Sequence, residues 1–285
     1  MGFSLYVPRP VRAGLAIVVL VALAGTTYQG VTTSLERRRY PHPGRLVDVG
    51  GHQLHIRCTG HGTPIVVLEA PAAAMSASWA RVQDALSPTT RVCSYDRAGL
   101  GWSERGDGPF DPNQVPLELQ ALLAGAGEKP PFVVAGAGLG AAFARTFAAR
   151  YPRTIGAVVL LDAPENGHAS RDRDSLGRMP HAMPWLARVG LLRAMGGSRR
   201  AMEPEVLSFM NRPDHLTRAA LELARWDDIT RLTDDAALAE ARVRVISAAL
   251  PGPIGSDDGA EAAVAAIRQT LTTPAGSSAA RSAAP

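Results

Sequence analysis

The middle of this 285-residue chain alternates short β-rich runs with longer stretches rich in alanine and leucine. The short runs predict strands at 46–49, 52–58, 65–69, 91–95, 132–135, 157–161 and 243–247. The longer stretches predict helices at 79–86, 116–126, 140–150 and 260–271. Strands and helices that alternate in this way are typical of a mostly parallel sheet with helices on both faces. The pattern therefore predicts one α/β domain over residues 41–271, with a glycine-turned hairpin at Gly50-Gly51.

The strand pattern stops between Pro164 and Asp235. This stretch contains three amphipathic segments, at 185–195, 203–210 and 215–226, which are separated by proline, glycine and asparagine. Because it is inserted between two predicted strands, we expect a helical lid over about residues 164–235. Lids over the carboxyl ends of strands commonly shape a ligand pocket.

The two ends of the chain differ from the predicted domain. Arg9 and Arg12 precede a run without charges, 13–35, which is long enough to span a bilayer as one helix. The small residues of Ala22-Leu23-Ala24 also fit a cleavage site, so residues 1–40 are expected to be a signal peptide or a membrane anchor. Arginines flank the run on both sides, which leaves the orientation open. Residues 272–285 are mainly alanine, serine, glycine and proline and predict a disordered tail.

The charge and the cysteine and histidine patterns narrow the choice of partners. The net charge is +4, but the arginines are scattered and no basic stripe is interleaved with aromatic residues, so no nucleic-acid binding is expected. Cys58 and Cys93 are expected to be buried strand residues, with a disulfide only if the domain is exported and their strands are neighbours. His52 and His55 are three residues apart, a spacing that sends strand side chains to opposite faces. We expect neither a metal nor a cofactor.

Several strings resemble one known family. GRLVDVGGHQLHIRCTG, PIVVLEA, SASWARVQDAL, TRVCSYDRAGLGWSERG and FVVAGAGLGAAFARTFAARYPRTIGAVVLLDA are similar, in this order, to the first six strands of an α/β-hydrolase of the esterase and haloperoxidase-like branch. The resemblance is close over about residues 44–163 and loose over the lid. It implies an α/β-hydrolase fold whose C-terminal part is shortened. In this layout Asp96 and Arg97 are expected to form a structural ion pair or turn cap, and neither Ser94 nor Ser103 is expected to be a nucleophile.

The family's nucleophile position is changed in this chain. Members of the family present a serine from a G-x-S-x-G turn between a strand and a helix. The matching string here is Gly136-Ala137-Gly138-Leu139-Gly140, so Gly138 replaces the serine and offers no attacking group.

The resemblance implies losses elsewhere in the machinery. The oxyanion hole would use the backbone N–H groups of Leu139 and Ala72, but a glycine-rich loop is replaced by one that begins with Pro71. The histidine expected after the last strand is absent, because every histidine lies at or before His215. Asp257 and Asp258, near the start of the last helix, are expected to cap it rather than to orient a base.

These patterns predict a membrane-anchored or exported α/β-hydrolase-fold protein that lacks the Ser/His/Asp triad and acts as a non-catalytic ligand-binding or interaction protein. A small apolar ligand is the expected occupant of its pocket, with Pro71, Ala137 and His168 as candidate lining residues. One alternative is an ester hydrolase that works through an unrecognised site.

A further alternative is nucleotide binding. Gly136, Gly138 and Ala141 follow a strand and open a helix, and Asp162 ends the next strand, as in a dinucleotide-binding fingerprint. The motif lies on the fifth predicted strand rather than the first, which disfavours this interpretation.

Overall fold

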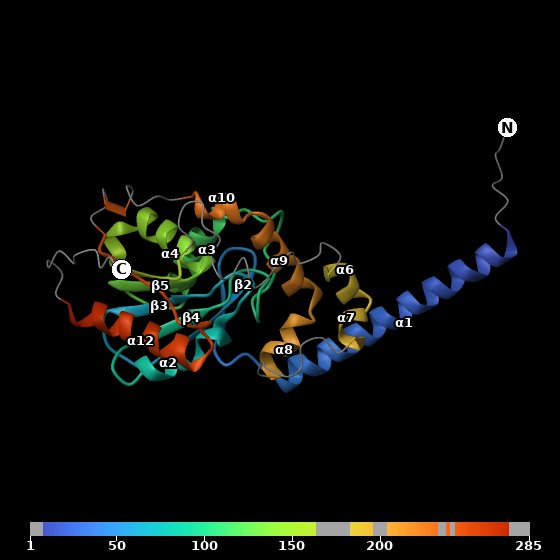
Figure 1. Ribbon diagram of the computed structural model, residues 1–285, viewed down its shortest axis with the longest axis horizontal. Helices are drawn as coiled ribbons and strands as arrows, with labels where there is room; N and C mark the ends of the chain where they lie inside the picture. The colour runs from blue at the N-terminus through green and yellow to red at the C-terminus, as the bar shows by residue number, and fades with distance from the viewer. Residues whose placement is uncertain (1–7, 164–182, 196–203, 233–237, 240–242, 274–285) are drawn as a thin grey trace. The chain divides into compact units, whose positions relative to one another are not determined.

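The computed structural model describes residues 8–163, 183–195, 204–232, 238–239 and 243–273 (Figure 1). The chain divides into two compact units. One comprises residues 1–41 and 180–216, and the other comprises residues 42–179 and 217–285. The inserted segment, which we expected to be a single lid, is therefore shared between the two units.

The larger unit is built on one sheet. Its seven described strands are ordered β1-β2-β4-β3-β5-β6-β7. Their bounds are Arg45–Asp48, Gln53–Thr59, Ile65–Glu69, Val92–Tyr95, Phe132–Ala137, Ile155–Leu161 and Val245–Ala248 for β1 to β7. The pairs β1–β2 and β2–β4 are antiparallel, and the other neighbours are parallel. The predicted fold class is thus confirmed, and each predicted strand is found within two residues of its expected ends.

Helices cover both faces of this sheet. They are α2 (Ala80–Leu86), which follows a 3-10 turn at Ser76–Trp79, α3 (Gln114–Gly125), α4 (Leu139–Arg150) and α12 (Asp257–Thr272). Alternate strand residues divide between two hydrophobic clusters: Val67 and Val134 pack with α3 and α4, whereas Val66 and Val133 pack with α2 and α12. This alternation follows from the period of two in a strand. Because β3, β4, β5, β6 and β7 are parallel, their carboxyl ends meet at one edge of the sheet. The turn after β5 leads into α4 at this edge.

The structure resolves one open expectation about this unit and corrects another. The strands of Cys58 and Cys93 are neighbours, which was one condition for a disulfide, and the antiparallel register of β2 and β4 places the two cysteines directly opposite each other, where they are bonded. The last helix is capped by Ser256 rather than by an aspartate, since the Ser256 side chain accepts a hydrogen bond from the N–H of Gly259 at 3.2 Å. Asp257 and Asp258 lie in the first turn instead, where their charge favours the helix dipole.

The smaller unit is helical. The long helix α1 (Arg9–Arg39) is, among the described residues, the one helix long and apolar enough to cross a membrane. With it are grouped α6 (Met183–Arg188), α7 (Leu191–Ala194) and α8 (Pro204–Met210), and α9 (Pro213–Ala224) runs on into the larger unit. The single helix expected at 185–195 is divided at Gly190, which has a φ of 70°.

Candidate functional site

The turn between β5 and α4 has the backbone geometry of a nucleophile elbow. Gly138 lies at the bend with φ 53° and ψ −124°, and its N–H donates to the carbonyl oxygen of Leu161 in β6 at 2.9 Å. A Cβ atom on Gly136 would collide with the backbone of Gly140, and one on Gly140 would collide with the carbonyl oxygen of Ala70. The glycines on either side are therefore needed for close packing, whereas Gly138 provides a bend without a side chain.

The loop after β3 runs beside this elbow. Pro71 is half-buried, whereas Ala72 and Ala73 are almost fully buried. Ala73 has a φ of 57°, a left-handed conformation that residues with a Cβ rarely adopt. Its N–H donates to a carboxylate oxygen of Glu222, from α9, at 3.2 Å. A carboxylate from the inserted segment therefore fixes the loop that would supply half of an oxyanion hole.

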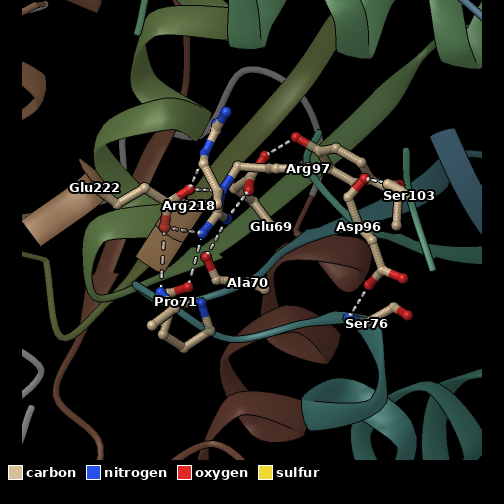
Figure 2. Close-up of polar contacts among 11 residues, drawn as sticks. Glu69, Ala70, Pro71, Ser76, Asp96, Arg97, Ser103, Arg218 and Glu222 are labelled. Atoms are coloured by element: carbon tan, nitrogen blue, oxygen red, sulfur yellow. Dashed lines mark hydrogen bonds and ion pairs between the residues drawn. The ribbon is translucent and has the colours of Figure 1, made fainter. Parts of the chain in front are cut away.

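Arg97 lies at the centre of a buried charge network (Figure 2). It binds Glu222 in a bidentate manner, with Nε–Oε1 and Nη2–Oε2 distances of 2.8 Å each. Its Nη1 donates to Oε1 of Glu69 at 2.6 Å and to the carbonyl oxygen of Ala70, and its Nη2 donates to the carbonyl oxygen of Pro71 at 2.9 Å. We call Glu69, Arg97, Arg218 and Glu222 the arginine network; in it Arg218 donates from Nε to Glu222 at 3.0 Å.

The network consists of two cations and two carboxylates, so its formal charges cancel. Burial by itself raises the pKa of Glu222, but the charges of Arg97 and Arg218 and the hydrogen bonds from Arg97 and Ala73 lower it to about 2. Burial raises the pKa of Glu69 above its usual value despite the attraction of Arg97. Tyr95 donates its hydroxyl hydrogen to Glu69, and burial followed by the charge of Glu69 raises its pKa. The geometry is that of a structural clamp joining β3, β4 and α9.

Asp96 caps the turn that follows β4, as we expected from its place in the sequence. Its Oδ1 accepts the N–H of Ser76 at 2.6 Å, and its Oδ2 accepts the N–H of Trp102 at 3.0 Å. Ser103 donates its hydroxyl hydrogen to the backbone carbonyl oxygen of Asp96 (Figure 2). Arg97 does form ion pairs, but with Glu69 and Glu222 rather than with Asp96.

A serine, a histidine and an aspartate also meet beside this turn. Nδ1 of His55 is 3.0 Å from Oδ2 of Asp96 and 3.4 Å from Oγ of Ser76, and all three residues are buried. A catalytic histidine uses one ring nitrogen for the aspartate and the other for the serine. Here both partners contact Nδ1, and within the described part of the chain Nε2 of His55 has no hydrogen-bond partner. The arrangement therefore does not form a proton relay.

A hydrophobic cluster covers the elbow. Ala72 and Leu139, whose N–H groups the family would use, belong to it together with Val115 and Phe143. Trp226 and Ile229 of α10 (Trp226–Thr230) complete it, and both are almost fully buried. Side chains from the inserted segment therefore share one buried hydrophobic cluster with both candidate oxyanion positions.

The remaining candidate residues lie in separate places. Ala137 is buried among the residues that pack against α2 and α12, and His168 lies outside the described residues. Oδ1 of Asp162 accepts the N–H of Leu250 at 2.8 Å, which ties the end of β6 to the segment after β7. His52 lies 3.5 Å from Glu118, so its partner differs from that of His55.

The arginine network was missed by the sequence analysis. A signal for it exists in the string PIVVLEA, because Glu69 ends an otherwise apolar strand, and a buried carboxylate requires a partner. The partner of Glu69 is Arg97, and the second carboxylate on Arg97, Glu222, lies 125 residues beyond Arg97 in the inserted segment, so no local pattern identifies the network.

The fold and the elbow together define a class of protein, and comparisons with known proteins agree. Residues 63–188 match the family described as alpha/beta hydrolase fold. The structure of Cfl2 from Burkholderia cenocepacia is similar with a TM-score of 0.58 and 20% identity, over 79% of this chain and 94% of that one. Residues 63–188 therefore resemble the α/β-hydrolase family, and the larger unit has the α/β-hydrolase fold.

Two curated relatives are similar over a part of their length. A probable transporter, efuK, of Hormonema carpetanum is 33% identical over 129 residues, which are 42% of this chain and 18% of that protein. An uncharacterized vacuolar membrane protein of Saccharomyces cerevisiae is 29% identical over 130 residues, which are 39% of this chain and 20% of that protein. The match thus concerns one segment of much longer proteins.

Proposed function

We propose that this chain is a membrane-anchored α/β-hydrolase-fold protein that does not hydrolyse esters and serves as a ligand-binding or interaction module. The observation that carries the proposal is Gly138, which occupies the elbow but has only a hydrogen atom where an attacking hydroxyl group is required. Loss of the serine lowers the turnover of a triad enzyme by roughly a millionfold.

The surroundings of the elbow support the same proposal. Ser76, His55 and Asp96 are buried, and their geometry does not suit proton transfer to a substrate. Trp226 and Ile229 belong to the same buried hydrophobic cluster as the two candidate oxyanion positions, so a ligand that reached these positions would have to enter an apolar cluster. A small apolar ligand is therefore the class that we expect a site at this edge to accept.

Three observations support an anchored domain on the oxidising side of a membrane. The helix α1 is long and apolar enough to cross a bilayer, and two relatives are named as a transporter and a vacuolar membrane protein. The Cys58–Cys93 disulfide belongs to a compartment in which disulfides persist, and the cytosol is not such a compartment.

The proposal is tested by treating the full chain, purified in detergent, with a fluorophosphonate probe and with short-chain p-nitrophenyl esters. We expect no covalent labelling and no turnover above background, whereas an active serine esterase added to the same sample should be labelled. Labelling of any serine, located by mass spectrometry and abolished by Ser76→Ala or Ser103→Ala, would favour an unrecognised hydrolytic site instead.

The variant Gly138→Ser gives a sharper test. A serine would restore the missing hydroxyl group, but the chain carries no histidine after β7, where the family places its base, so we expect activity to stay at background. The positive φ should also cost about 1–3 kcal/mol of stability, as for other strained residues. Gly138→Ala is the matched control, because it imposes the same strain without the hydroxyl group; a large difference in ester turnover between the two variants would contradict the proposal.

A further inference from the structure

The helices α6 and α7 are packed closely against the middle of α1 (Figure 1). A Cβ atom on Gly25 would collide with the carbonyl oxygen of Val189, and one on Gly190 would come within 2.9 Å of the carbonyl oxygen of Gly25. The two backbones therefore touch because both contact residues are glycines. We call the segment Met183–Met195, which contains α6 and α7, the α6–α7 hairpin.

Polar contacts fix the hairpin to the C-terminal half of α1. Arg193 of α7 is buried and donates from Nη2 to Oε2 of Glu36 at 3.0 Å and from Nε to Oε1 of Gln29 at 3.1 Å. Gln29, also buried, donates to the carbonyl oxygen of Asn211 at 2.7 Å. The position of the hairpin along α1 is thus determined by interactions within one compact unit.

The outer surface of the hairpin is apolar and exposed. Trp185 and Met195 are 69% and 72% exposed, and Val189 and Leu191 are also exposed. Pro184 and Ala187 are buried on the inner side. The guanidinium group of Arg188 lies 4.9 Å from the centre of the Trp185 ring, so a cation–π contact accompanies the exposed tryptophan.

The apolar surface continues along α1. Val18, Leu20, Val21 and Leu23 are exposed and lie on the N-terminal side of the glycine contact. Gly25 is 14 residues after Val11, which corresponds to about 21 Å of helix, so it falls about 9 Å short of the far face of a hydrocarbon layer about 30 Å thick that begins at Val11. An exposed tryptophan beside an arginine is the combination that membrane interfaces favour.

We propose that the α6–α7 hairpin inserts its apolar side chains, Trp185, Val189, Leu191 and Met195, into the lipid interface beside α1, so that two segments of the chain contact the bilayer side by side. This inference rests on the proposed membrane anchoring by α1, and it names the lipid surface as the partner of the hairpin. The exposed apolar side chains of α1 and of the hairpin then form one continuous lipid-facing surface.

The test uses the full chain in vesicles of phosphatidylcholine and phosphatidylglycerol. Met195→Cys is labelled with an environment-sensitive fluorophore under non-reducing conditions, in which Cys58 and Cys93 remain paired. Addition of doxyl-labelled phosphatidylcholine should quench this label by about twofold, as expected for a residue at the interface. Val18→Cys on α1 is the positive control, and Glu261→Cys, an exposed position on α12, is the negative control. Leu191→Cys provides a second position on the hairpin if Met195→Cys does not fold.

The two proposals fail in different ways. Quenching at Val18→Cys without quenching at either hairpin position would overturn this inference and leave the anchor in place. The absence of quenching at all three positions would overturn the membrane anchor itself. Equal quenching at Met195→Cys and Glu261→Cys would also contradict the inference, because contact with lipid would then not be specific to the hairpin.

Discussion

Arg97 joins three segments that lie far apart in the sequence. It contacts Glu69 at the end of β3 and Glu222 in α9, and it accounts for the low pKa of Glu222 together with Arg218. A buried ion is costly unless it is paired and hydrogen-bonded, and both guanidinium and carboxylate groups satisfy this condition here. Loss of one partner therefore leaves an uncompensated charge in the interior.

Glu222→Gln should lower the free energy of unfolding by about 3–5 kcal/mol, because Arg97 would lose its bidentate partner in a buried site. Asp228→Asn is the matched control: Asp228 pairs with Arg225 at the surface, and both are about half exposed. This control should change stability by less than about 1 kcal/mol. Urea unfolding of both variants measures the difference in free energy of unfolding. Similar losses in the two variants would show that the buried arginine network contributes no more to stability than a surface ion pair.

The pKa of Glu222 also predicts a pH dependence. A carboxyl group whose pKa is lower in the folded state than in the unfolded state stabilises the fold above its unfolded pKa. This contribution should be lost as the pH falls from about 4.5 towards 2. Glu69, whose pKa is raised, acts in the opposite direction and favours the folded state on protonation. The free energy of unfolding of Glu222→Gln should therefore fall less steeply over this range than that of the natural sequence; parallel curves would contradict the assignment.

At the scale of elements, the disulfide and the inserted helices limit how far the sheet edge can move. The bond joins β2 to β4, and the two cysteines are separated by 35 residues. From the inserted segment, Glu222 binds Arg97 and the N–H of Ala73, and Trp226 shares a hydrophobic cluster with residues of α4. The loop after β3 and the helix after the elbow are therefore both held by the inserted segment, although the elbow carries no nucleophile.

Removal of the disulfide has a predictable cost. A double variant with Cys58→Ser and Cys93→Ser should lose about 3–4 kcal/mol, mainly because the unfolded chain gains the entropy of an open loop of this length. A reductant should lower the thermal unfolding midpoint of the natural sequence to that of the double variant. The midpoint of the double variant itself should not change on reduction. An unchanged midpoint after reduction would show that the bond does not contribute.

At the scale of the whole molecule, the proposed anchor and the disulfide together predict a topology. If α1 spans the membrane with residues 42–285 on the oxidising side, alkaline phosphatase fused after Pro285 should be active in a bacterial host, and a green fluorescent protein fused there should not fluoresce. The same fusions to a chain that begins at Pro41 should reverse both results. Fluorescence of the full-length fusion would place the domain on the cytosolic side.

The sequence by itself determined the strands and helices of the larger unit, because periods of 2 and 3.6 residues are local properties of the chain. It also determined the glycine at the elbow, since Gly138 lies within a motif that is five residues long. Cys58 and Cys93 had to be brought into register by β2 and β4 before they could bond, so the disulfide appeared only in the tertiary structure. The arginine network and the contact of α1 with the α6–α7 hairpin likewise join residues more than a hundred positions apart, and burial, which gives such contacts their energy, exists only after the chain has folded.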